Sequence, residues 1–138
     1  MALTQTMTTS FKAELPQAVH NLLTDTIQMA LYTSEATLNA DTTTYAFTAN
    51  EVVASGYTAG GVVLTGVTIS TANNVAYISF DNPTWNAALT ARGALIYNVT
   101  QGGKSVAVLD FGADKTSSAT FTVTLPANTS NSSVLRIA

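Results

Sequence analysis

The chain has 138 residues, a formal net charge of −3 and no cysteine; 46% of its residues are hydrophobic and only 9% are charged. This length suits one domain, and the lack of cysteine excludes a disulfide framework and a thiolate metal site. The five basic residues are scattered, so nucleic-acid binding is not expected, and no apolar run approaches the roughly 18 residues of a membrane span.

The N-terminal part of the chain predicts an arm followed by one short helix. Residues 1–10 are polar and rich in hydroxyl groups, so we expect them either to fray or to add a strand to a neighbouring subunit. From Phe11 onward apolar residues recur on one helical face, but Pro16 has no N–H to donate. We therefore expect the helix to begin near Leu15 and Pro16, with proline in its first turn, and to end by Leu23.

The rest of the chain is typical of short β-strands separated by Gly, Asn and Pro. We expect eight strands, over residues 27–32, 44–48, 62–70, 75–80, 89–98, 105–110, 119–125 and 133–137. Turns are predicted at Asn73-Asn74 and at Gln101-Gly102-Gly103. Alternation predicts that Phe121, Val123 and Leu125 point inward. This rhythm predicts one antiparallel β-sandwich, jelly-roll or immunoglobulin-like, over residues 11–138.

No group of residues in the sequence predicts catalysis. His20 is the sole histidine, and a lone histidine on a helix is far more often a surface or capping residue than a base. Asp110 and Asp114 lie close in sequence, but calcium needs six to eight oxygen ligands and their spacing matches no calcium loop. We expect them to cap a turn in which Gly112 takes a special backbone angle. The sequence thus predicts no enzyme, no cofactor and no metal.

Three residues are candidates for a protein interface. Trp85 and Tyr57 lie in loop-like stretches, where an aromatic side chain anchors an interface as often as it forms a sugar platform. Arg92 interrupts a neutral strand, so we expect it to pair with Asp81 or Asp110, to face a subunit interface, or to point to solvent. The scarcity of charge favours a surface that neighbouring subunits cover, because burying hydroxyls and amides costs less than burying ions.

Several stretches together resemble a family of small virion proteins of tailed bacteriophages. The resemblance covers nearly the whole chain after residue 8, in order: SFKAELPQAVH, TDTIQMALYTSEATL, ANEV, GYTAGGVVLTGV, PTWNAALTARGALIYN, SVAVLDFGADKTSSATFTVTLPA and the terminal LRIA. It implies a virion structural protein and carries over no catalytic residue. The chain departs from the family pattern at Pro16, which interrupts a helix that is unbroken in the family.

These observations lead to one favoured function and its alternatives. We expect a capsid decoration or cement protein that binds the major capsid protein at capsomer junctions, as a homo-oligomer with a trimer favoured. No secretory signal is evident, so synthesis in the host cytoplasm and a final place on the capsid surface are expected. The alternatives are a tail-fibre or receptor-binding module that recognises host glycans, and a head–tail accessory protein.

Overall fold

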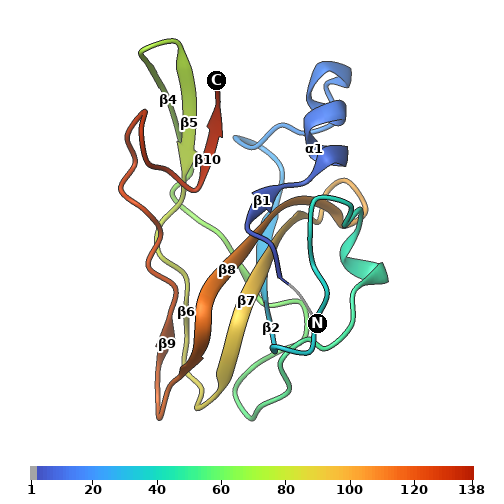
Figure 1. Ribbon diagram of the computed structural model, residues 1–138, viewed down its shortest axis with the longest axis vertical. Helices are drawn as coiled ribbons and strands as arrows, with labels where there is room; N and C mark the ends of the chain where they lie inside the picture. The colour runs from blue at the N-terminus through green and yellow to red at the C-terminus, as the bar shows by residue number, and fades with distance from the viewer. Residues whose placement is uncertain (1–2) are drawn as a thin grey trace.

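A computed structural model of the protein describes residues 3–138, and in this part of the chain it contains ten strands arranged in three antiparallel sheets (Figure 1). The predicted all-β, sandwich-like class is confirmed. The largest sheet has the order β1-β8-β7-β2-β3, and the others are β10-β5-β4 and β6-β9. The strands are β1 Thr6–Met7, β2 Ile27–Tyr32, β3 Val62–Val63, β4 Thr68–Ala72, β5 Val75–Ser79, β6 Thr84–Trp85, β7 Thr90–Asn98, β8 Lys104–Thr116, β9 Phe121–Thr122 and β10 Leu135–Ile137.

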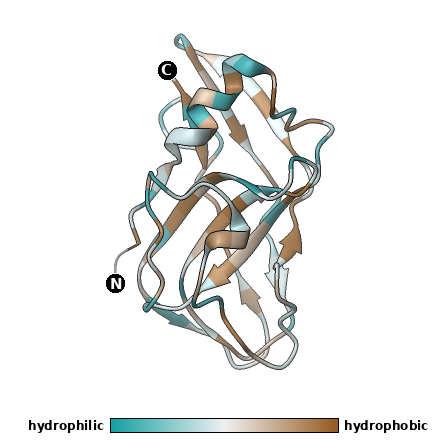
Figure 2. Ribbon diagram, turned by 90° about the vertical axis from the view of Figure 1, so that its right-hand side faces the viewer, coloured by the Kyte–Doolittle hydropathy of each residue, from teal (hydrophilic) through white to brown (hydrophobic). Residues whose placement is uncertain are grey.

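The central sheet is buried on both faces. Along β2 and its neighbours, alternate side chains enter two separate hydrophobic clusters. Met29 and Ile96 belong to the larger cluster, whereas Ala30 and Leu95 belong to the smaller one on the opposite face. Burying each large apolar side chain contributes about 1.5–3 kcal/mol. In Figure 2 the hydrophobic colour accordingly concentrates in the strands, and the connecting loops are mostly hydrophilic or neutral.

Two smaller sheets extend the core. In Figure 1 the β4-β5-β10 sheet stands at the upper left, and the β6-β9 pair stands below it beside the lower half of β8. The predicted hairpin at Asn73-Asn74 is confirmed, because both residues have positive φ angles, of 54° and 64°, as a two-residue hairpin turn requires. The predicted turn at Gly102-Gly103 is confirmed by positive φ angles at both glycines.

The predicted helix boundaries are wrong. Helix α1 spans Thr9–Glu14, and Pro16 lies in a 3₁₀ turn, Leu15–Gln17, that ends the helix instead of beginning it. Thr8 caps the helix by accepting a hydrogen bond from the N–H of Phe11. Pro16 is tolerated because a helix end leaves its carbonyls without intrahelical partners in any case.

The described part of the predicted arm, residues 3–10, packs on its own domain. Thr6 pairs with Val108 and Met7 with Ala107, so β1 forms an edge of the central sheet. Phe11, the first apolar residue of α1, is fully buried and fixes the following segment in place. The alternatives considered from sequence, a frayed terminus or a strand added to a neighbour, both omit this pairing within the chain.

Other strand boundaries differ from the expectation. Residues 45–47 form a 3₁₀ turn, Tyr45–Phe47, where a strand was predicted. The predicted strand over residues 62–70 is divided into β3 and β4, because Gly66 between them has a positive φ of 66°. In residues 119–125 the inward placement of Phe121, Val123 and Leu125 is confirmed, although only Phe121–Thr122 forms a regular strand.

Candidate interaction site

A loop over residues 45–61, called here the Glu51 loop, is fastened by one carboxylate. Glu51 accepts hydrogen bonds from the Tyr45 hydroxyl at 2.6 Å, the Tyr57 hydroxyl at 2.6 Å and the Gly60 N–H at 2.7 Å. Three donors that converge on a carboxylate make hydrogen bonds roughly twice as strong as neutral ones. The two ends of the loop are therefore tied to its centre.

The Glu51 loop is also attached to the central sheet. The N–H of Val52 donates to the Leu31 carbonyl at 2.9 Å, and the N–H of Leu31 donates to the Tyr57 hydroxyl at 2.8 Å. The Tyr45 ring stacks on the Tyr97 ring with centroids 4.6 Å apart. The loop thus continues the sheet beyond β2 and has a defined shape without regular secondary structure.

The tyrosines of this region are held in their neutral form. Burial, together with the negative charge of Glu51, raises the pKa of Tyr97 to about 12. Burial is also the main reason why the pKa values of Tyr32, Tyr45 and Tyr57 are raised above the ordinary range. Neutral phenols keep their hydroxyl protons, which is what donation to the Glu51 carboxylate requires.

Two apolar side chains of the Glu51 loop are almost fully exposed to solvent. Phe47 is 86% exposed and Val53 is 97% exposed, the two largest values among the exposed large hydrophobic residues described. They lie four residues before and two residues after Glu51. Because the loop is already ordered, burying them against a partner would cost little additional conformational entropy. The loop is therefore suited to be an interface anchor.

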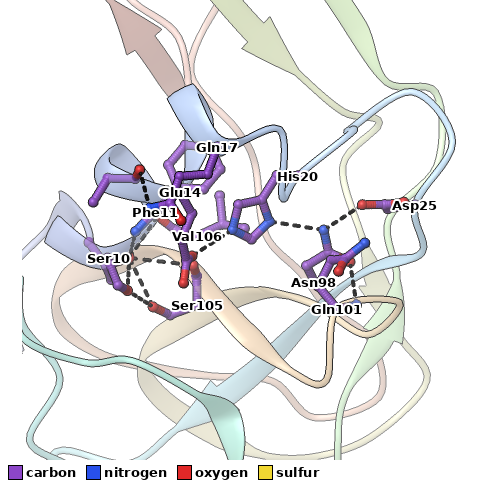
Figure 3. Close-up of polar contacts among 12 residues, drawn as sticks. Ser10, Phe11, Glu14, Gln17, His20, Asp25, Asn98, Gln101, Ser105 and Val106 are labelled. Carbon is purple, nitrogen blue, oxygen red and sulfur yellow. Dashed lines mark hydrogen bonds and ion pairs between the residues drawn. The ribbon is translucent and has the colours of Figure 1, made fainter.

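His20 belongs to a buried polar chain that links α1 to the end of β7 (Figure 3). Its Nε2 lies 2.8 Å from Glu14 Oε1, and its Nδ1 lies 3.0 Å from Asn98 Nδ2. The Asn98 amide also donates to Asp25 at 2.9 Å, so the amide's second hydrogen points to His20. This pattern fits the tautomer that accepts at Nδ1 and donates from Nε2 to Glu14.

The expectation that His20 is a surface or capping residue is wrong. Its side chain has no solvent exposure, and one side of the ring packs on Phe11 with centroids 4.9 Å apart. Both nitrogens already have partners, and neither partner is a hydroxyl nucleophile. The chain from Glu14 to Asp25 therefore connects three segments of the fold and stabilises their arrangement.

Ser105, which lies near this chain in Figure 3, forms a second buried junction with Thr8. The Ser105 hydroxyl lies 2.9 Å from the Thr8 hydroxyl and 2.6 Å from the Thr42 carbonyl. The Thr8 N–H donates to the Val106 carbonyl at 3.0 Å. Thr8 thus caps α1 and fixes it to β8, which makes this junction structural.

The predicted carboxylate partner of Arg92 is confirmed as Asp110. Arg92 Nε lies 3.0 Å from Asp110 Oδ1, at a place where the register between β7 and β8 shifts. The same oxygen accepts from the Gly112 N–H at 2.9 Å, and Gly112 has a φ of +82°, as expected for this glycine. The Gly112 hydrogen bond first, and Arg92 second among the favourable contacts, lower the pKa of Asp110.

The expectation that Trp85 and Tyr57 lie free in loops is wrong for both. Trp85 lies on β6 and is 3% exposed, and its ring packs edge-on against Phe121 with centroids 6.1 Å apart. Tyr57 is buried and uses its hydroxyl on Glu51 and on the Leu31 N–H. Neither ring offers a face to a sugar or a partner; both are parts of the core.

Sequence reasoning missed the residues that make the Glu51 loop distinctive. Glu51 lies six residues from Tyr45 and six residues from Tyr57, and this symmetric spacing of one acid between two phenols is the signal that was available. Phe47 was assigned to a strand interior, where alternation explains an aromatic residue as core. The 3₁₀ turn instead directs it into solvent.

Within residues 3–138, no cluster of three or more His, Cys, Asp or Glu residues is placed to hold a metal ion, and no helix is long and apolar enough to cross a membrane. Models of protein families, curated proteins and solved structures give no significant match to this chain. Function must therefore be argued from the chain's own residues.

Proposed function

We propose that this chain is a structural module that acts by assembling with other protein subunits. The observation that carries the proposal is the Glu51 loop, which is fastened by hydrogen bonds to Glu51 and yet exposes Phe47 and Val53 almost completely. Exposed apolar side chains scattered singly are common, but two on one pre-ordered loop have the properties of interface anchors.

The composition of the surface supports the same conclusion. With 9% charged residues, the chain relies on hydroxyl and amide groups for its solubility. Interface cores are depleted of charge, and neutral polar groups cost less to desolvate than ions. The buried polar groups around His20 and Ser105 are engaged with one another, and they support the fold.

Within this class, the particular role we propose is that of a capsid decoration protein of a tailed bacteriophage. It would bind the major capsid protein at capsomer junctions as a homo-oligomer, with a trimer favoured. The resemblance of the sequence to small virion proteins, the single small β domain and the neutral surface support this choice. Many weak contacts on a repeating lattice would add through multivalency.

The proposal is tested on virions of the phage that encodes the chain. Cryo-electron microscopy of intact particles should show the protein on the shell, with the Glu51 loop against a neighbouring subunit. Virions that carry the protein only in the tail would instead support the fibre or head–tail alternative and refute the decoration role.

A variant pair tests the part played by the loop. Replacing both Phe47 and Val53 by alanine should reduce occupancy on the particle by about tenfold or more, since buried anchors cost over 1 kcal/mol each when truncated. Val99→Ala is the matched control, because Val99 is an exposed valine outside the loop. Equal occupancy of the double variant and the control would refute the role of the loop.

A further inference from the structure

A trough of about 680 Å³ lies between the distal half of β8 and the segment that contains β9. Figure 1 shows these two strands at its lower left. One wall comes from the distal half of β8 and the residues that follow it, and the other from residues 120–126. The lining is mixed, with hydroxyl side chains such as Thr116, Thr122 and Thr124 and apolar side chains such as Phe111 and Val134.

The β8 wall is the edge of the central sheet that β1 leaves uncovered. β1 pairs with β8 only at Ala107 and Val108, and the Asp110 N–H then donates to the Gln5 side chain at 3.1 Å. Beyond this point the N-terminal segment departs, since the Thr4 N–H donates to the Leu38 carbonyl at 2.9 Å. In the described part of the chain, the rest of the β8 edge therefore has no strand paired with it on this side.

The hydrogen-bonding pattern between β7 and β8 shows which main-chain groups of β8 point to the open edge. In an antiparallel pair, residues alternate between those that bond to the partner strand and those whose N–H and C=O point away from it. The Ser117 N–H donates to the Leu89 carbonyl at 2.9 Å, and Thr116 pairs with Thr90. The main-chain groups of Thr116 consequently point away from β7, to the open edge.

The opposite wall is open in the same way. The Val123 N–H donates to the Pro83 carbonyl at 3.0 Å, and the Leu125 N–H donates to the Asn82 side chain at 2.8 Å. These bonds lie on the β6 side, so the alternate residues Thr122 and Thr124 direct their N–H and C=O groups away from β6. Both threonines line the trough.

We propose that the trough receives an extended, uncharged segment of a partner subunit, which pairs as an added strand with the main chain of Thr122 and Thr124. This inference rests on the proposed function as an assembly module and identifies a second contact of that assembly. Strand addition satisfies main-chain groups on an open edge and needs no specific side-chain chemistry. β1, with the sequence Thr6-Met7, already shows that an uncharged segment fits the neighbouring part of the β8 edge.

The charges that line the trough indicate what kind of segment it could bind, and the backbone geometry indicates which of the two walls that segment would pair with. Asp110 is already paired with Arg92, so among the lining residues only Lys115 offers an uncompensated charge. On the β8 wall, Gly112 has a positive φ and interrupts the ladder, and such a bulge with flanking charges protects an edge against pairing. The Thr122–Thr124 wall carries neither device, which is why we assign the added strand to it.

Amide hydrogen exchange at single-residue resolution tests the inference on the full chain, free and bound to virions. The amides of Thr122 and Thr124 should exchange at least about tenfold more slowly in the bound protein, because each gains a hydrogen bond. Thr84 is the internal control, since it pairs with Thr122 and lies outside the trough, so its exchange should not change.

A variant pair adds a second readout. Thr124→Pro removes the free N–H and takes away no main-chain bond of the fold, whereas Thr124→Val keeps the N–H and changes only the side chain. The proline variant, checked for folding by its circular dichroism and melting temperature, should lose about tenfold in occupancy on particles, and the valine variant should bind normally.

The outcomes separate this inference from the function on which it rests. Slower exchange at Thr122 and Thr124 with unchanged Thr84 supports the strand. Protein that is present on virions but exchanges at these amides as fast as free protein overturns the strand and leaves the assembly role intact. Protein that is absent from every virion fraction overturns both.

Discussion

Replacement of Glu51 by glutamine should destabilise the fold markedly although the side chain keeps its shape. The carboxylate accepts from two tyrosine hydroxyls and the Gly60 N–H, all within 2.7 Å. Hydrogen bonds to a charged group contribute about 1.5–3 kcal/mol and neutral ones about 0.5–1.5 kcal/mol, so weakening three of them costs roughly 2 kcal/mol after allowance for partial exposure. The amide nitrogen of glutamine cannot accept a hydrogen bond, so at least one of the three donors would lose its acceptor.

Urea denaturation at pH 7, followed by circular dichroism, measures this loss. A change of about 2 kcal/mol corresponds to a fall in melting temperature of roughly 6–10 °C for a domain of this size. Glu35→Gln is the matched control, because Glu35 is exposed and its carboxylate makes no ion pair within residues 3–138. If Glu51→Gln and Glu35→Gln unfolded at the same urea concentration, the carboxylate would not be what fastens the loop.

Three further perturbations have defined outcomes. Trp85→Ala should lower the free energy of unfolding by about 3–5 kcal/mol in urea titrations, because it empties a buried ring site, and a loss below 1 kcal/mol would contradict the core placement. Gly61→Ala should prevent stable folding, as judged by proteolysis, because its Cβ would overlap the Met29 carbonyl at a φ of +82°. The pKa of Tyr97 is raised to about 12 in the folded protein, so this side chain stabilises the fold below about pH 10, and the contribution is lost as the pH rises to about 12. In Tyr97→Phe the free energy of unfolding should therefore fall less steeply over this pH range, by up to about 1.4 kcal/mol per pH unit.

The strands that could be predicted well are those whose signal is local. The predicted strand over residues 27–32 coincides with β2, since Ile27–Tyr32 is apolar almost throughout and bounded by polar residues. The hairpin at Asn73-Asn74 was likewise predictable, because few residues adopt two successive positive φ angles. For the helix, periodicity indicated the apolar face that begins at Phe11, but it did not show on which side of Pro16 the helix forms.

Tertiary packing decides which of the aromatic side chains discussed above are buried and which are exposed. Trp85 and Tyr57 have no periodic pattern around them, yet β9 and Glu51 bury them. Phe47 lies in an alternating stretch and is nevertheless exposed. Phe47 lies in a 3₁₀ turn that also contains Tyr45, and the Tyr45 ring stacks on Tyr97, which is distant in the sequence.

By itself, the sequence determined that the chain is an antiparallel β protein with few charged residues, and it left Arg92 with three expected environments, of which a carboxylate partner was one. Composition, alternation and turn residues act over a few neighbours, so they can be read from the chain in order. Only the tertiary structure decided that Glu51 collects three donors, that His20 is buried, and that two open strand edges face one trough. Each of these depends on residues far apart in the sequence being brought within a few ångströms by the fold.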